Sequence, residues 1–138
     1  MKISSRVQSS EGQFHVTLRT NSDVHELAIP PKASGFGSSA NGGELLFLAL
    51  ATCYCNDLYR EASKRGIRVQ QVEVEVQGDF GAEGEPAKNV TYAAKVQAAA
   101  TEAEIRDLMA HTDRVAEIQN TLRVKTPVTI DRVEAVVA

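Results

Sequence analysis

A continuous apolar run in the middle of the chain constrains the fold more than any other feature. Residues 45–55 are apolar at every position except one threonine, so a helix formed here would be buried on all sides. Glu44 places an acid in the first turn of this helix, and Lys64 places a cation in the last turn, before a terminating Gly66. We therefore predict a long central helix over 42–66, around which the rest of the chain packs.

The size and charge of the chain exclude several classes of protein. With 138 residues and 43% hydrophobic content, residues 1–138 can form a single domain with its own core. A net charge of −3 with scattered Lys and Arg predicts no nucleic-acid partner. The apolar run spans about 11 residues, roughly half the 20 that a membrane span needs, so no membrane is expected. Residues 1–6 lack the apolar core of a signal peptide, which predicts a cytoplasmic protein.

The segments on either side of the central helix alternate in polarity, as strands do. Residues 2–29 divide at turn signals into about three short antiparallel strands. After the helix, residues 72–76 and 90–96 read as a hairpin with one apolar face. Residues 127–137 are expected to close the chain as a strand.

Two short helices are expected between the hairpin and the last strand. Thr101 and Glu104 form a capping box that opens the first of them, and Asp113 or Thr112 caps the second. Because strands and helices come in runs, we predict an α+β fold with antiparallel sheets packed around the long helix.

Both cysteines of the chain, Cys53 and Cys55, lie in the predicted central helix. Residues two apart on a helix are rotated by about 200°, so the sulfurs point to nearly opposite faces and cannot bridge while the helix holds. The spacing matches neither a disulfide framework nor a zinc motif, and the three histidines are dispersed. We therefore expect no metal and no cofactor.

The two cysteines face different surroundings. Cys55 shares its face with apolar residues, which predicts a packed and inert thiol. Cys53 lies where the apolar half of the helix meets a charged half. Arg60, about two turns away, would favour the Cys53 thiolate, whereas Asp57, one turn away, would oppose it. Spacing alone leaves Cys53 either reactive or packed in the core.

Three short segments of the chain resemble a known protein family. The Gly-Glu-Leu-Leu at 43–46, the Ala-Thr-Cys that ends at Cys53 and the Asn-Thr-Leu at 120–122 resemble the OsmC/Ohr family. The resemblance implies an OsmC-like fold and an intertwined homodimer with two sites at the subunit interface. It also implies that an organic hydroperoxide oxidises a cysteine thiolate to a sulfenic acid, which a second cysteine resolves and an external thiol or lipoyl-type reductant restores. Cys53 falls on the peroxidatic position.

The chain departs from the family pattern at three catalytic positions. Ala116 stands where the resolving cysteine is expected, and Glu117 stands at the position of a proline. In the peroxidases of the family, a glutamate ten residues before the cysteine activates its thiol, and Gly43 occupies that position here. Glu44 comes one residue later, as in a more divergent OsmC-like branch, and its side chain would point about 100° away. Residues 8–12, in the first hairpin turn, offer no match for the activating arginine.

The sequence therefore leaves two alternative functions open. In the first, the protein is a thiol-dependent peroxidase of the oxidative stress response, and Cys53 is the catalytic residue that reduces organic hydroperoxides. An external thiol, or Cys55 after local unwinding of the helix, would resolve the oxidised Cys53, with Glu44 as a further accessory residue. In the second, the protein is a non-enzymatic dimer of the same fold that binds a small hydrophobic ligand in an apolar interfacial pocket.

Overall fold

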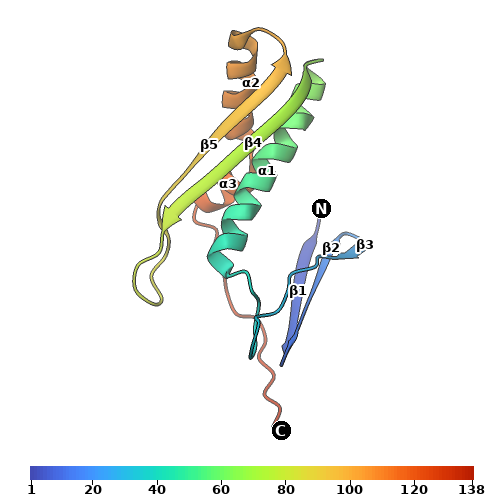
Figure 1. Ribbon diagram of the computed structural model, residues 1–138, viewed down its shortest axis with the longest axis vertical. Coiled ribbons are helices and arrows are strands. Elements are labelled where there is room, and N and C mark those ends of the chain that lie inside the picture. The colour runs from blue at the N-terminus through green and yellow to red at the C-terminus, as the bar shows by residue number, and fades with distance from the viewer. The chain divides into compact units, whose positions relative to one another are not determined.

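The fold is described from a computed structural model that covers residues 1–138 (Figure 1). Its elements are β1 (Ile3–Ser10), β2 (Gln13–Thr20), β3 (Asp23–Glu26), α1 (Gly42–Lys64), β4 (Arg68–Asp79), β5 (Lys88–Ala99), α2 (Glu102–Val115) and α3 (Glu117–Arg123). Two antiparallel sheets and one long helix confirm the predicted α+β class. The chain forms two compact units, Met1–Leu46 and Phe47–Ala138, and the expectation of one domain stays a prediction.

The first unit contains a three-stranded antiparallel sheet with the strand order β1-β2-β3. The first two strands pair along their whole length, with Val7 opposite Val16. Val16 is the one buried hydrophobic side chain of this unit, while β1 and β3 are exposed throughout. The three short strands expected within 2–29 are thus confirmed.

Helix α1 begins and ends where its sequence signals predict. The side-chain oxygen of Asn41 accepts a hydrogen bond from the Glu44 N–H at 2.8 Å, and the Glu44 carboxylate accepts one from the Asn41 N–H at 3.0 Å. This reciprocal pair is a capping box, which satisfies two N–H groups at the start of the helix. After the helix, Gly66 adopts a φ of 65° that other residues rarely tolerate, and the Ile67 N–H donates to the Ala62 carbonyl at 3.0 Å.

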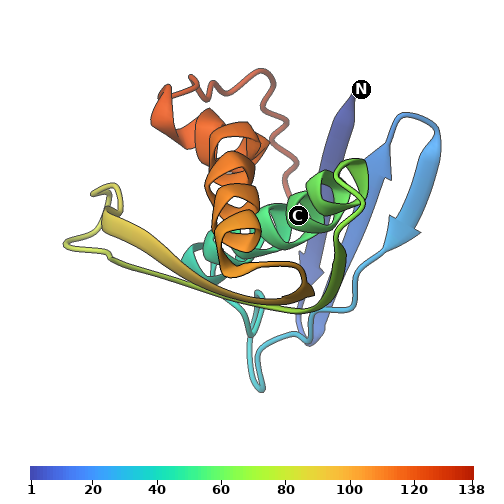
Figure 2. The same ribbon diagram turned by 90° about the horizontal axis from the view of Figure 1, so that it is seen from above.

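The hydrophobic core lies in the second unit, where α1 and α2 cover one face of the β4-β5 hairpin (Figure 2). Its buried residues are Tyr54, Leu58, Ala62 and Leu108. Half-buried side chains from alternate positions of the two strands pack against them: Val72, Val74, Tyr92, Ala94 and Val96. The hairpin therefore has the single apolar face that its alternating sequence predicts.

The connection between α2 and α3 differs from the prediction in one respect. The capping box of Thr101 and Glu104 is present, but α2 runs through to Val115, so neither Thr112 nor Asp113 caps a second helix. Both side chains are already engaged, because the Thr112 hydroxyl donates to the Leu108 carbonyl at 2.8 Å and Asp113 accepts hydrogen bonds from Tyr92 and Arg123. Instead, the buried Ala116 separates the two helices.

The strand predicted over 127–137 is wrong for this structure, in which residues 124–138 contain no strand. Its apolar side chains are exposed, with 96% of Val128, 83% of Ile130 and 91% of Val136 accessible. A strand needs a neighbour to accept and donate its backbone hydrogen bonds, and no element of the same chain pairs with this segment. None of the three helices has the length and apolar content that a membrane span requires.

Candidate functional site

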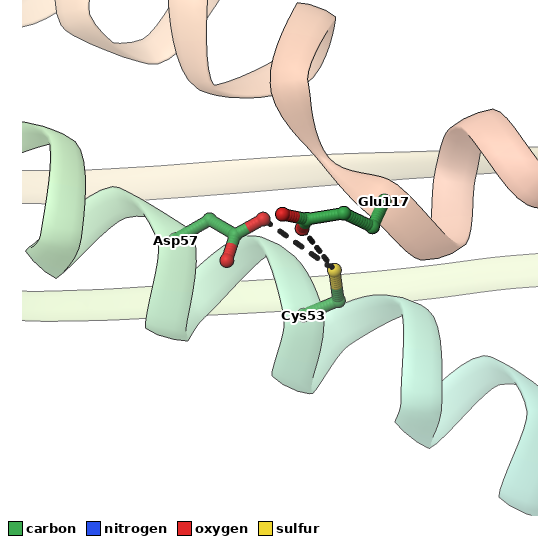
Figure 3. Close-up of side chains that lie close together, drawn as sticks. All are labelled: Cys53, Asp57 and Glu117. Carbon is green, nitrogen blue, oxygen red and sulfur yellow. Dashed lines mark hydrogen bonds between the residues drawn. The ribbon is translucent and has the colours of Figure 1, made fainter. Parts of the chain in front are cut away.

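Cys53 lies in a small cluster of acidic side chains that come from two helices (Figure 3). Asp57 is one turn further along α1, so both side chains point to the same face of the helix. The Cys53 thiol donates to Asp57 Oδ2 at 3.6 Å, and Glu117 Oε2, from the first residue of α3, lies 3.9 Å from the sulfur. The fold thus brings two carboxylates to one thiol.

Arg60 is the cation that compensates these carboxylates. Its guanidinium donates to Asp57 Oδ1 at 2.9 Å, to Glu117 Oε1 at 3.3 Å and to Glu61 Oε1 at 3.0 Å. In Asp57 and Glu117, Arg60 thus binds the oxygen other than the one next to the sulfur. Asp57 and Glu61 are buried, whereas Arg60 and Glu117 are exposed, so the cluster reaches the solvent through both the guanidinium and the Glu117 carboxylate. Arg60 therefore forms its ion pairs with the carboxylates and not with a Cys53 thiolate.

The surroundings of Cys53 disfavour its thiolate. Burial of the half-buried side chain is the largest effect that raises the pKa of the thiol, and the negative charges of Asp57 and Glu117 raise the pKa further. A hydrogen bond from the backbone N–H of Ile118, in the first turn of α3, acts in the opposite direction. The sequence left open whether Arg60 or Asp57 would dominate, and in this structure the balance favours the protonated thiol.

The two carboxyl groups beside the sulfur differ in their affinity for protons. Burial raises the pKa of Asp57, and its hydrogen bond with Glu117 raises it further, despite the nearby Arg60. The same hydrogen bond holds the pKa of Glu117 below its usual value. Asp57 is therefore the carboxyl group of the pair that takes up a proton first.

Further charged side chains lie along α1, beyond Asp57 and Arg60. The Glu61 carboxylate accepts from Lys64 at 2.9 Å, and His111 Nε2 of α2 lies 3.2 Å from its other oxygen. The hydrogen bond from Lys64, followed by that from Arg60, lowers the pKa of Glu61 to about 2. Sequence reasoning missed Glu61 and His111, which lie 50 residues apart in the chain, because no local pattern connects them.

Cys55 and Glu44, the two accessory candidates, lie in other surroundings. Cys55 is half-buried and lines a shallow groove of about 240 Å³, together with Asn56 and Val74, so the prediction that its thiol is packed in the core is wrong. Its sulfur therefore lies outside the acidic cluster. The Glu44 carboxylate is engaged by the Asn41 N–H in the capping box of α1, so the structure assigns it a role in starting the helix.

The cluster also contains atoms that could hold a metal ion. Ligand atoms of Cys53, Asp57 and Glu117 all lie within 4.8 Å of one another, close enough to share one cation. However, Arg60 already supplies a positive charge to both carboxylates. The expectation of no metal stays a prediction.

Comparisons with known proteins agree with this fold. A family model described as OsmC-like protein matches residues 35–131. An OsmC-like protein structure from Mycoplasma pneumoniae superposes with a TM-score of 0.58 at 18% identity, over 87% of each chain. An OsmC-like protein of unknown function from Vibrio cholerae gives 0.58 at 12% identity, over 88% of this chain and 93% of that one. An OsmC-like hydroperoxide resistance protein from Jannaschia gives 0.54 at 17% identity, over 96% and 90%. No curated protein sequence matches.

Proposed function

The chain belongs to the family of OsmC-like proteins, and we therefore propose that it reduces small organic hydroperoxides through Cys53. The observation that carries this proposal is the thiol itself, which is half-buried on the central helix and donates its proton towards Asp57 at 3.6 Å. The family resemblance of the sequence, which implies that Cys53 is the peroxidatic cysteine, supports this proposal. A neighbouring structure that bears the name of a hydroperoxide resistance protein has the same fold.

In this reaction Asp57 is proposed to handle the proton, because it accepts a hydrogen bond from the thiol. Asp57 Oδ2 accepts the thiol proton, and its raised pKa makes it suited to hold that proton. The thiolate then attacks the distal oxygen of the peroxide, the O–O bond breaks, and a sulfenic acid forms on Cys53. The leaving alkoxide takes the proton from Asp57 and departs as an alcohol.

The oxidised cysteine must be reduced by a thiol from outside the chain in this scheme. Position 116 carries an alanine, and Cys55 is rotated to another face of α1. A first external thiol displaces water from the sulfenic acid and forms a mixed disulfide, and a second thiol releases the reduced Cys53. We propose a cytoplasmic location, where such thiols are abundant, and a low turnover, since burial and two carboxylates oppose the thiolate.

We expect sub-millimolar cumene hydroperoxide to add one oxygen to the reduced protein, as read by intact mass. Cys53→Ser should abolish this addition because it removes the only thiol in the acidic cluster. Cys55→Ser tests the route of resolution, since a disulfide between the two cysteines cannot form in it. An unchanged mass for the reduced wild-type protein, or equal oxidation of the Cys53→Ser variant, would exclude the peroxidase.

The second candidate function is a non-enzymatic dimer that binds a small hydrophobic ligand. The raised pKa of Cys53 and the alanine at position 116 favour it, because both slow a thiol cycle. A Cys53→Ala protein that binds an apolar fluorescent probe with unchanged affinity, while the wild type shows no peroxide oxidation, would select this function. Loss of probe binding in the same variant would speak against it.

Both functions are proposed for a homodimer. Apolar side chains remain exposed on α1, including 54% of Leu48 and 43% of Tyr59, and along residues 127–137. A second copy could bury these side chains and provide a strand neighbour for the last segment. We expect sedimentation at micromolar concentration to give twice the subunit mass, and deletion of residues 127–138 to weaken the association. A monomer at all concentrations would contradict the proposal.

A further inference from the structure

Two carboxylate oxygens lie beside the Cys53 sulfur in the acidic cluster, together with the backbone N–H of Ile118. Asp57 Oδ2 and Glu117 Oε2 lie 3.6 and 3.9 Å from the sulfur, whereas Arg60 binds Oδ1 and Oε1 of the same two groups. The negative ends of these ion pairs therefore face the sulfur. Since electrostatic energy falls with distance, the sulfur experiences the carboxylates more strongly than the guanidinium.

The remaining charges near the cluster do not reverse this balance. On α1, Glu61 shares Arg60 and is also bound by Lys64 at 2.9 Å. On α2, His111 lies 3.2 Å from Glu61 Oε2 and thus addresses Glu61 rather than Asp57 or Glu117. Arg60 and Lys64 are thus bound to carboxylates of the cluster, and neither of them contacts the sulfur.

Glu117 is the more exposed of the two carboxylates beside the sulfur. Its side chain is 64% exposed, whereas that of Asp57 is 9% exposed. In the proposed reaction Asp57 takes up the thiol proton and becomes neutral, but Glu117 keeps its charge because its pKa is lowered. During attack, therefore, Glu117 is the negative group that stands beside the thiolate on the solvent side.

We propose that Glu117 makes the Cys53 site selective for uncharged or cationic reaction partners, and against peroxides and thiols that carry a carboxylate. This selectivity rests on the proposed function of Cys53, but it acts on any molecule that reacts with the sulfur. The charge of Glu117 would thus influence which oxidant and which external reductant react with Cys53. Glu117 acts through charge and is not itself a reacting group.

Three disulfides of similar size and different charge test this role without any peroxide. They are cystamine, which is dicationic, bis(2-hydroxyethyl) disulfide, which is neutral, and dithiodipropionate, which is dianionic. In each case the Cys53 thiolate attacks one sulfur, the S–S bond breaks, a mixed disulfide forms on the protein, and a small thiolate leaves and takes a proton from water. Because the same thiolate attacks all three, ratios of the rate constants cancel the fraction of Cys53 that is ionised.

The experiment compares variants in a Cys55→Ser background, so that each rate reports Cys53 alone. Glu117→Gln removes the charge and keeps the shape of the side chain. Glu75→Gln removes the same charge from the exposed face of β4 and is the matched control. The same protein unfolded in concentrated urea gives the intrinsic reactivity of each reagent, by which the folded rates are divided.

At low salt, we expect the cationic reagent to be favoured over the anionic one by about tenfold relative to the unfolded chain. Glu117→Gln should reduce this preference to about threefold or less, and salt should reduce it in the parent protein. The variant should also lower the apparent pKa in the rate profile of the neutral reagent, because a negative charge beside the thiolate is lost. Glu75→Gln should change neither quantity.

Equal ratios in folded and unfolded protein, or equal effects of the substitutions at positions 117 and 75, would overturn the charge selectivity. The result is independent of the peroxidase. A charge preference that depends on Glu117, with no oxidation by cumene hydroperoxide, would keep the selectivity and remove the peroxidase. Peroxide oxidation without any charge preference would do the reverse.

Discussion

Replacing Ala116 with cysteine is expected to give the chain a resolving thiol beside Cys53. Ala116 is fully buried at the start of α3, directly before Glu117, whose carboxylate reaches to 3.9 Å from the Cys53 sulfur. One equivalent of organic hydroperoxide should then produce a disulfide between positions 53 and 116. Because an intramolecular thiol replaces an external one, the sulfenic acid on Cys53 should be consumed about tenfold or more faster than in the parent protein.

Intact mass and peptide mapping report this disulfide as the loss of two hydrogens. Ala93→Cys introduces the same new side chain on the exposed face of β5 and serves as the control. It should form no bond with Cys53 and should leave the lifetime of the sulfenic acid at the parent level. If Ala116→Cys accumulates sulfenic acid without a disulfide, the two positions are not close enough for resolution.

The second large effect is expected in the core. Leu58 has no exposed surface and packs with Tyr54, Ala62 and Leu108 between the hairpin and the helices. Leu58→Ala should lower the free energy of unfolding by about 3 kcal/mol, because it removes buried apolar atoms and leaves a cavity. Urea unfolding followed by far-ultraviolet circular dichroism measures this change.

Leu122→Ala makes the same change at a position of α3 that is 44% exposed. We expect it to cost less than about 1 kcal/mol, since little buried area is lost there. Similar losses for the two variants would show that the cluster around Leu58 is not the main core.

The sequence was sufficient for most of the secondary structure because the signals that define it are local. The beginning of α1, the apolar alternation of β4 and β5 and the capping box of Thr101 and Glu104 each depend on residues close in the chain. The two errors have non-local causes. The side chain of Asp113 bonds Tyr92 of β5 instead of capping a helix, and residues 127–137 lack a neighbouring strand.

The site was predictable only in part for the same reason. The placement of Asp57 one turn from Cys53 follows from helical spacing, and the structure confirms that they are in contact. Glu117 is 64 residues away from Cys53, and its contact depends on how α3 packs against α1. The family resemblance of residues 120–122, which puts Ala116 at the resolving position, was the one signal that could have placed Glu117 near the sulfur. The direction of the Cys53 pKa shift required the geometry of both carboxylates.

The exposed segment 127–137 has a consequence for handling the protein. The valine and isoleucine residues of this segment have a high β-propensity, and its backbone N–H and C=O groups have no strand partner. Such a segment can pair with the same segment of other chains and so cause aggregation. Asp131, Arg132 and Glu134 interrupt the apolar positions and act as gatekeepers against such stacking. Replacing these three residues with uncharged ones would not change the acidic cluster around Cys53, but it would make the protein prone to precipitate.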